Sequence, residues 1–237
     1  TLRNDNSSRF GKLVEIHFRR PSGFRAAPEI AGARIVNYLL ERTRLSRPPT
    51  GERNFHILYQ LLASPAGNKA NDERAASLLS VLPIGQPERL HSLSAEQPWS
   101  VAEAAAEAAA FGATTATLQA LGVSADEREQ LWTLLTAVLL LGNLTFAPQG
   151  TNGCSLSDTA AQESLAKLLC VTPAALTAAL CMRKLNVRQQ QFHRPQSESQ
   201  AKDARDALGR ALYNGCVEWL VHKLNQTIRP KQIDADA

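Results

Sequence analysis

The sequence predicts a mostly α-helical protein with one short β-hairpin near its N-terminus. Most of its 237 residues fall in segments whose apolar residues recur at helical spacing, and several of these segments begin with a helix-capping residue. Only one stretch, residues 13–38, has the composition of paired strands. With 44% hydrophobic and 20% charged residues, the chain has an ordinary globular composition and is long enough to bury a sizeable core.

The hairpin is predicted from a run of β-forming residues followed by a turn. Residues 13–18 read LVEIHF, which alternates in type, and Pro21-Ser22-Gly23 supplies a turn. A returning strand over 29–38 completes the pair.

The first predicted helix covers Gly51 to Leu62, with Thr50 as its N-terminal cap. Its apolar residues share one face; they are Phe55, Leu58, Tyr59 and Leu62. Residues 65–97 are rich in proline and weakly patterned, with one expected helix over 72–79.

Two capping boxes predict helices that begin near Val101 and Ala125. Each box pairs a serine with a glutamate three residues later, as in Ser100 with Glu103 and Ser124 with Glu127. The alanine run 104–110 is kept helical because alanine is the best helix former. The second helix ends at Gly142-Asn143, and its apolar stripe consists of Leu131, Leu134, Leu135, Val138 and Leu141.

The C-terminal third predicts one long helix, Glu198 to Ile228, which would span about 45 Å at about 1.5 Å per residue. Gly209 and Gly215 should each cost on the order of 1 kcal/mol relative to alanine. A shorter helix is expected where Thr172 caps and Pro173 takes the first position. The apolar face expected for the long helix consists of Ala204, Leu208, Ala211, Leu212, Cys216, Trp219, Leu220 and Leu224.

The segment Asn4 to Lys12, NDNSSRFGK, has the chemistry of a site for a nucleotide polyphosphate and its magnesium ion. Such a ligand needs neutral hydrogen-bond donors, one or two oxygen ligands for the metal, and a nearby cation. Asn4, Ser7, Ser8 and Arg9 supply these groups. The alternative is a solvated polar turn before a strand.

Residues 182–197 carry several cations and no acidic residue, and are expected to form a loop that is either solvated or binds a partner; the cations are Arg183, Lys184, Arg188, His193 and Arg194. Pro148 to Cys154 is expected to be a surface loop or a plain connector to a helix starting near Ser157. The net charge of +4 permits an acidic partner without indicating nucleic acid.

The four cysteines show no metal-site or disulfide spacing, so reduced, packed thiols are expected. The longest apolar run, residues 131–141, is too short to span a bilayer.

Three segments resemble the heads of myosin motors. Asn4 to Lys12 meets every fixed position of the myosin switch I pattern Asn-x-Asn-Ser-Ser-Arg-Phe-Gly-Lys, whereas kinesins share only its Ser-Ser-Arg core. LLLGNLTF is similar to the myosin signature Leu-His-Leu-Gly-Asn-Ile-x-Phe, with Leu140 in place of histidine. Residues 203–225 resemble the long myosin helix with Asp-Ala-Leu-Ala-Lys-Ala-Leu-Tyr and Trp-Leu-Val-x-x-Ile-Asn, departing at Gly209, Asn214 and Gly215.

The resemblance implies roles for the residues of switch I. Asn4, Asn6, Ser7 and Ser8 would contact the nucleotide, with the Ser8 hydroxyl as a magnesium ligand. Ser7 would help to orient the attacking water, and Arg9 would pair with a glutamate of switch II, so that Ser7 and Arg9 are the expected catalytic residues.

The resemblance also implies how the chain is divided. It would begin at switch I (1–12), continue through a hairpin of the central sheet and transducer (13–38) and the helical upper subdomain of the actin-binding cleft (39–228), and stop before switch II. This places it in a mixed α/β P-loop NTPase motor head. Without the phosphate loop and switch II, the chain alone is expected to be inactive.

An actin-facing loop over 182–198 is implied as well, with contacts from Arg188, Gln190, Phe192, His193 and Arg194. Counting back sixteen residues from Asp206 reaches Gln190, where myosins commonly carry an acid or a phosphorylatable residue.

The function implied is ATP hydrolysis coupled to force on actin filaments in the cytoplasmic cytoskeleton. ATP and Mg²⁺ are the implied cofactors, and light chains are implied partners through a neck region outside this sequence. Two alternatives stay open: a non-hydrolysing actin-interaction module, and a helical scaffold or RNA-binding protein, against which the 5% aromatic content argues.

Overall fold

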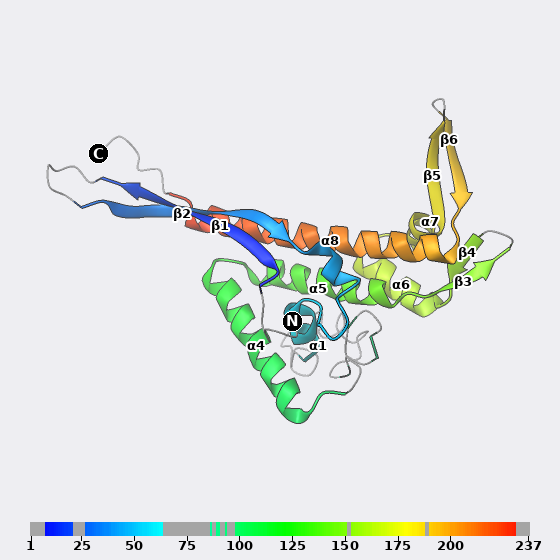
Figure 1. The fold of residues 1–237 in the computed structure, drawn as a ribbon, viewed down its shortest axis with the longest axis horizontal. Helices are drawn as coiled ribbons and strands as arrows, with labels where there is room; N and C mark the ends of the chain where they lie inside the picture. Colours follow the sequence, from blue (N-terminus) through cyan, green and yellow to red (C-terminus); the bar gives the residue numbers. More distant parts are fainter. Residues whose placement is uncertain are drawn as a thin grey trace.

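The computed structural model describes residues 8–20, 27–63, 86, 89–90, 93, 98–150, 153–187 and 190–230. In this part of the chain, a helical body carries three two-stranded antiparallel sheets, each formed by strands adjacent in sequence. The longest helix, α8 (Glu198–Ile228), runs along the length of the molecule (Figure 1). The expectation of a mostly helical chain is therefore confirmed, although one hairpin was expected and three are present.

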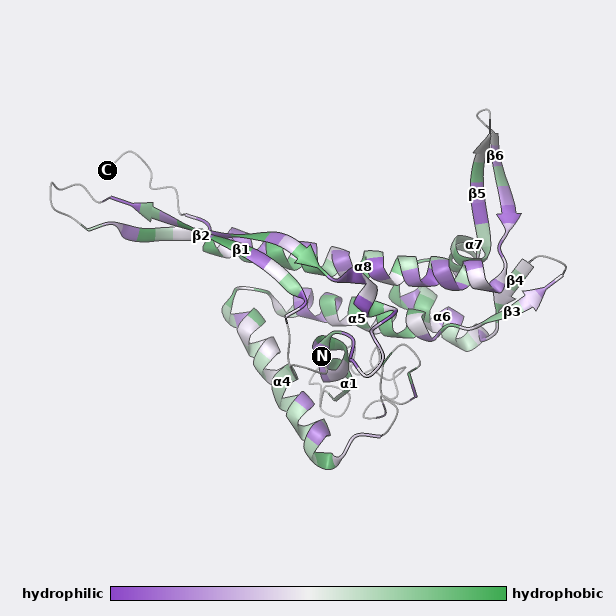
Figure 2. Ribbon diagram, viewed as in Figure 1, coloured by the Kyte–Doolittle hydropathy of each residue, from purple (hydrophilic) through white to green (hydrophobic). Residues whose placement is uncertain are grey.

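The N-terminal hairpin consists of β1 (Phe10–Arg19) and β2 (Glu29–Leu40), so the predicted hairpin is confirmed with longer strands. Its register runs from Phe10 opposite Leu40 to Arg19 opposite Glu29, with two shifts. The hairpin projects from the helical body and bears hydrophobic residues along both strands (Figure 2). Several of these are more than half exposed: Leu13, Ile16, Phe18, Ile30, Tyr38 and Leu39.

The first helix begins five residues later than predicted. A 3₁₀ turn, η1 (Arg42–Leu45), follows β2, and α1 covers His56–Ala63 rather than Gly51 to Leu62. Gly51 has a positive φ of 76°, and Asn54 is buried with its amide donating to the carbonyls of Arg44 and Leu45. These contacts hold residues 51–55 in an irregular conformation, so Thr50 is not a helix cap.

The helices with capping boxes form as predicted. In α4 (Val101–Ala120) and α5 (Ala125–Asn143), the Ser100 and Ser124 hydroxyls accept from the backbone of the glutamate three residues on. Two shorter helices follow, α6 (Thr159–Leu168) and α7 (Pro173–Cys181), the second capped by Thr172 as predicted. The expected helix at 72–79 lies outside the described residues.

Helix α8 has the predicted bounds, but its buried face differs from the predicted one. The buried residues are Ala201, Gly209, Tyr213 and Cys216, whereas Ala211 and Trp219 are exposed. The difference arises because Gly209 allows a close approach, and because Tyr213 stacks on Phe55 with 4.5 Å between ring centroids. The predicted apolar face included neither Gly209 nor Tyr213.

Two core clusters lie on either side of the α5–α8 contact. One is formed chiefly by α1, α4, α5 and α8, and the other by α5, α6, α7 and the strand β4. Leu140 and Leu212 pack against both clusters and join them. Leu140 therefore fills a core position.

Two segments that were expected to be loops are hairpins. Strands β3 (Phe146–Gln149) and β4 (Gly153–Leu156) pair where a surface loop or connector was expected, and β5 (Met182–Val187) and β6 (Gln190–Pro195) pair where the cationic loop was expected. Both are short and polar, so neither shows the apolar alternation that marks a half-buried strand.

No single described helix is long and apolar enough to cross a membrane, although α6 and α7 satisfy the length and composition criteria as a pair bent by 104°. All four cysteines are free thiols. Cys154, Cys181 and Cys216 are buried, but Cys170 is exposed, so the expectation of packed thiols is wrong for Cys170.

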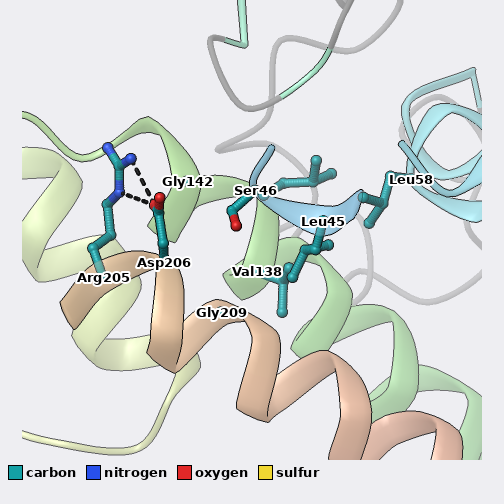
Figure 3. A pocket seen from close by; sticks show the side chains of 9 residues that line it. Leu45, Ser46, Leu58, Val138, Gly142, Arg205, Asp206 and Gly209 are labelled. Atoms are coloured by element: carbon teal, nitrogen blue, oxygen red, sulfur yellow. Dashed lines mark hydrogen bonds and ion pairs between the residues drawn. The ribbon is translucent and has the colours of Figure 1, made fainter. Parts of the chain in front are cut away.

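A small cavity of about 70 Å³ lies where η1, α5 and α8 meet (Figure 3). It is bordered by Leu45, Val138 and Gly209, with Asp206 and Ser46 supplying polar groups. A methyl group on Gly209 would stand 3.7 Å from side-chain carbons of Leu45 and Leu141, which is ordinary van der Waals contact. The site therefore has room for alanine.

We predict that Gly209→Ala and Gly215→Ala each stabilise the fold by about 1 kcal/mol, because both glycines lie inside α8 and neither added methyl group meets a close contact. The control is Gly32→Ala, whose methyl group would lie 2.5 Å from the backbone nitrogen of Pro230. Chemical denaturation of the three variants checks this. Equal destabilisation by all three would contradict the packing described for α8.

Candidate functional site

Ser8 and Arg9 are the two predicted nucleotide-site residues that the structure describes; Asn4, Asn6 and Ser7 lie outside the described residues. The exposed Ser8 hydroxyl donates to the carbonyl oxygen of Phe10 at 3.0 Å. A hydroxyl that donates its proton in this way keeps its oxygen lone pairs for another partner, such as a metal ion. The role of Ser8 as a magnesium ligand stays a prediction.

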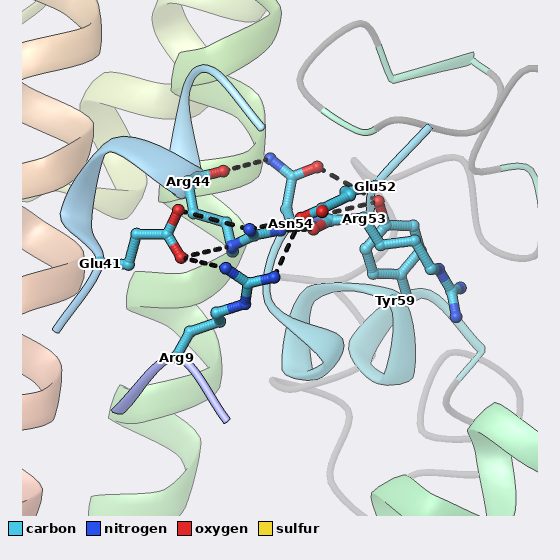
Figure 4. Close-up of polar contacts among 7 residues, drawn as sticks. All are labelled: Arg9, Glu41, Arg44, Glu52, Arg53, Asn54 and Tyr59. Carbon is cyan, nitrogen blue, oxygen red and sulfur yellow. Dashed lines mark hydrogen bonds and ion pairs between the residues drawn. The ribbon is translucent and has the colours of Figure 1, made fainter. Parts of the chain in front are cut away.

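Arg9 is anchored by both its backbone and its side chain. Its carbonyl accepts from the backbone N–H of Glu41 at 3.1 Å, which continues the β1–β2 ladder by one more pair. Its guanidinium donates to Glu41 at 2.9 Å and to Glu52 at 3.1 Å. Two carboxylates within the chain therefore contact Arg9 (Figure 4), and the expected pairing with a switch II glutamate outside this sequence stays a prediction.

Arg44 binds the same two carboxylates from the opposite side. Its Nε lies 3.0 Å from Glu41 and one of its terminal nitrogens lies 2.6 Å from Glu52. The Arg44 side chain is only 3% exposed, whereas Arg9 is 25% exposed. The result is a quartet of two arginines and two glutamates, with Arg44 at its buried end and Arg9 at its open end.

The two arginines favour the ionised form of both glutamates. The hydrogen bond from Arg44 is the largest influence that lowers the pKa of Glu41 and of Glu52, and burial opposes it. Burial also lowers the pKa of Arg44, but its bonds to the two glutamates outweigh burial and raise this pKa overall. Glu41, Glu52 and Arg44 are therefore charged at neutral pH.

Polar contacts among residues 44–59 surround the quartet. Arg44 donates to the carbonyl of Arg53 at 2.9 Å, and the Tyr59 hydroxyl contacts the Asn54 side chain at 3.2 Å. Arg53 lies over the Tyr59 ring, 3.8 Å from its centroid, and pairs with Glu107 of α4 at 2.7 Å. The Arg53 side chain thus contacts α1 and α4, while its backbone carbonyl accepts from Arg44 of the quartet.

The predicted actin-facing residues lie on the β5–β6 hairpin, which directly precedes the N-terminal end of α8 (Figure 1). Arg188 lies outside the described residues, and of Gln190 only the backbone pairing with Val187 is described. Phe192 is 49% exposed, and His193 and Arg194 are exposed beside it.

The register of this hairpin places like charges opposite each other. Arg183 pairs with Arg194, and Lys184 pairs with His193. Opposed like charges destabilise a strand pair. Among the described residues, no carboxylate lies within ion-pair distance of these side chains, so the part of the hairpin near its base presents a positive surface.

Helix α8 connects the two regions. The side-chain amide of Asn225 accepts from the Ile35 N–H at 2.7 Å and donates to the Ile35 carbonyl at 2.8 Å, which joins α8 to β2. At its other end, Ser197 caps α8 directly after β6, and the Gln196 N–H donates to the Cys181 carbonyl at 2.8 Å. Each hairpin is therefore attached at one end of the same helix.

Comparison with known proteins assigns the family. The model of the myosin head (motor domain) matches residues 1–237, the full length of the chain. The chain belongs to the myosin head family. It is 38% identical over 236 residues to a myosin-I heavy chain of Dictyostelium discoideum, and 34% identical over 238 residues to unconventional myosin-Ic of Rattus norvegicus.

These matches cover 98% and 99% of this chain but only 9% and 21% of the two relatives. A match of 35% identity to the myosin IA heavy chain of Dictyostelium discoideum covers 23% of that protein. The chain thus spans less than a quarter of the length of the relatives it matches.

Within this myosin head chain, sequence reasoning identified Arg9 but missed its partners. Glu41 and Glu52 are 32 and 43 residues from Arg9 in the chain, and no local pattern connects them. The one available signal was the density of alternating charges in residues 41–53. Among the described residues, no group of three His, Cys, Asp or Glu side chains could hold a metal ion.

We predict that this quartet stabilises the myosin head chain at neutral pH and loses that effect in acid. The pKa of Glu41 and of Glu52 is lower in the folded chain than the ordinary value of 4.5, so their stabilisation is present above that value and is lost as the pH falls through the lowered pKa. Between pH 7 and pH 3, the unfolding temperature should fall less steeply for the double variant Glu41→Gln, Glu52→Gln than for the wild type. If the unfolding temperatures of the two proteins fall equally with pH, the ionisation of the two glutamates is not linked to folding.

Proposed function

We propose that this chain forms the part of an actin-based motor that contacts both the terminal phosphate of Mg-ATP and the actin filament. Membership of the myosin head family is the observation that carries the proposal. Two further features support it: the Asn4–Arg9 segment has the donors, oxygen ligand and cation that Mg-ATP needs, and the β5–β6 hairpin presents an exposed cationic surface.

In this proposal, the Asn4–Arg9 segment binds phosphate through neutral donors and a hydroxyl oxygen. Asn4, Asn6 and Ser7 donate to phosphate oxygens, and Ser7 also orients the attacking water. Ser8 holds the magnesium ion through its hydroxyl oxygen, and the bound ion would neutralise charge that develops on the phosphate oxygens. Phosphoryl transfer to water needs mainly positioning and charge stabilisation, which these residues supply.

Arg9 fixes the end of this segment. Because its carbonyl and its guanidinium are both held by the 41–52 region, the backbone directly after Ser8 has a defined position. A small displacement of a group that orients the nucleophile lowers the rate strongly. We therefore assign Arg9 to the hydrolysis step rather than to nucleotide affinity.

The second half of the proposal is contact with actin through the β5–β6 hairpin. The surface groups are Phe192, His193 and Arg194, to which Arg188 and Gln190 are added from the sequence. Opposed cations repel each other in the free hairpin, and an acidic surface on the filament would relieve that repulsion. We extend the proposal to location, because a protein with this contact would act on the actin cytoskeleton, and to light chains, which would bind through a neck region outside this sequence.

The alternative function is an actin-interaction module that does not hydrolyse ATP. The 237-residue sequence contains no Gly-x-x-x-x-Gly-Lys-Ser/Thr phosphate loop, so hydrolysis requires residues from elsewhere in the protein. Mg-ATP turnover by a motor domain that contains this chain separates the two functions.

For the nucleotide site, we predict that Ser8→Ala in such a motor domain weakens magnesium-dependent retention of ATP at least tenfold, because the variant loses the metal-ligand oxygen. Ser8→Thr is the matched control, since it keeps the hydroxyl and should stay within about threefold of wild type. Release of a fluorescent ATP analogue with and without Mg²⁺ measures the effect. Equal behaviour of the two variants would exclude Ser8 as the ligand.

For the actin site, we predict that the hairpin cations set actin affinity. Arg194→Ala should weaken co-sedimentation with filaments severalfold, and added salt should reduce the difference. The control is Arg34→Ala, because Arg34 is 64% exposed but lies on β2 at the opposite end of α8. If both variants bind actin equally well, the hairpin is not the contact.

The same assay tests regulation at this hairpin. Gln190 cannot be phosphorylated, so kinase treatment should leave actin-activated ATPase unchanged, whereas Gln190→Glu supplies a constant negative charge and should change it. The rival phosphorylation sites are Ser197 and Ser199. Ser197 caps α8, so Ser197→Asn is used because asparagine also caps, together with Ser199→Ala. Kinase-dependent activity that these changes abolish would refute the prediction.

A further inference from the structure

In the Arg9–Glu41–Arg44–Glu52 quartet, Arg44 contacts both glutamates, so these three residues form a unit that does not require Arg9. Arg44 bridges Glu41 and Glu52 at 3.0 and 2.6 Å and is tied by its backbone to Asn54 and by its side chain to the Arg53 carbonyl. All of these residues belong to one continuous stretch, 41–54. Arg9 comes from a different part of the chain and reaches this unit from its open side.

The two acceptor oxygens are shared between the arginines. Glu41 Oε2 accepts from Arg9 at 2.9 Å and from Arg44 at 3.0 Å, and Glu52 Oε2 accepts from Arg9 at 3.1 Å and from Arg44 at 2.6 Å. Arg44 therefore fixes the two oxygens at the spacing of the two terminal nitrogens of Arg9. A planar guanidinium has a rigid fork, so this spacing determines where the Arg9 side chain lies.

We propose that Glu41, Arg44 and Glu52 are positioning residues for the ATPase reaction, and that they act through Arg9. This inference rests on the proposed function. The unit of residues 41–54 is a preorganised acceptor that holds Arg9 and, through the adjoining backbone, Ser8. Its effect falls on the hydrolysis step, because alignment of the attacking water is sensitive to small displacements, whereas nucleotide affinity is spread over many contacts.

The charge balance favours this role over a simple ion pair at the surface. Two positive and two negative charges neutralise one another, which allows Arg44 to be 3% exposed and Glu52 to be 13% exposed. Removing one carboxylate leaves a nearly buried arginine with an unbalanced charge. The geometry of Arg9 therefore depends on residues that never touch it directly, of which Arg44 is the clearest case.

The test uses a motor domain that contains this chain and compares Glu52→Gln with Glu107→Gln. Glu107 is the matched control because it forms a comparable ion pair with the neighbouring Arg53, at 2.7 Å and 15% exposure, without contacting Arg9. We expect Glu52→Gln to lower kcat at least tenfold while KM and the affinity for Mg-ATP change less than about threefold. Glu107→Gln should leave kcat within about twofold. Equal effects of the two variants on kcat would overturn the proposal.

A double-mutant comparison shows whether the glutamate acts through Arg9. If it does, Arg9→Ala with Glu52→Gln should be no slower than Arg9→Ala alone. If the two losses multiply, Glu52 acts by another route and the proposal fails. Glu41→Gln serves as a second variant where Glu52→Gln does not fold, because Glu41 is 32% exposed and its loss disturbs the buried end less.

The measurements distinguish failure of the proposed ATPase function from failure of the positioning proposal. A wild-type motor domain that neither binds nor hydrolyses Mg-ATP would refute the ATPase proposal itself. The positioning proposal is refuted when the wild type is active and Glu52→Gln retains its kcat. Thermal unfolding of the wild type, the two single variants and the double variant measures the coupling between Arg9 and Glu52 without any nucleotide, and additive changes in stability would count against the quartet.

Discussion

The arrangement of this chain depends on one amide group that joins a helix to a strand. Asn225 of α8 pairs with both backbone groups of Ile35 at 2.7 and 2.8 Å, as the backbone of a neighbouring strand would. Unsatisfied backbone groups at a partly buried strand edge are costly, and Asn225 satisfies both groups of Ile35. Gly32 permits the approach, since a methyl group there would overlap the backbone of residues 228–230.

The contact fixes the hairpin that carries Arg9 to one end of a helix of 31 residues, whose other end begins directly after the β5–β6 hairpin. A helix of that length is stiff, and it is packed along its side against α5 through the small residue Gly209. The β1–β2 and β5–β6 hairpins are therefore joined through one element, with the two core clusters meeting at its middle.

Local sequence signals predicted most of the helices and little of the tertiary detail. Ser100, Ser124 and Thr172 identified helix starts because capping chemistry is contained within four residues. The start of α1 was misplaced because buried Asn54 bonds to residues nine and ten positions away, which overrides a helical pattern. The hairpins at β3–β4 and β5–β6 were missed because their strands are too polar or too short to show a period of two. In the site, a nine-residue motif identified Ser8 and Arg9, whereas Glu41, Arg44 and Glu52 are joined to Arg9 only by the fold.

Two groups of charged residues in this chain differ in their charge balance. Around Arg9, two arginines and two glutamates neutralise each other, so the group can be partly buried and rigid. On the β5–β6 hairpin, Arg183 opposes Arg194 and Lys184 opposes His193, and the repulsion is kept at the surface. A balanced group needs no partner and can define a geometry, while an unbalanced group gains free energy when an acidic surface arrives. The first is suited to defining the position of a side chain, and the second to meeting an acidic partner.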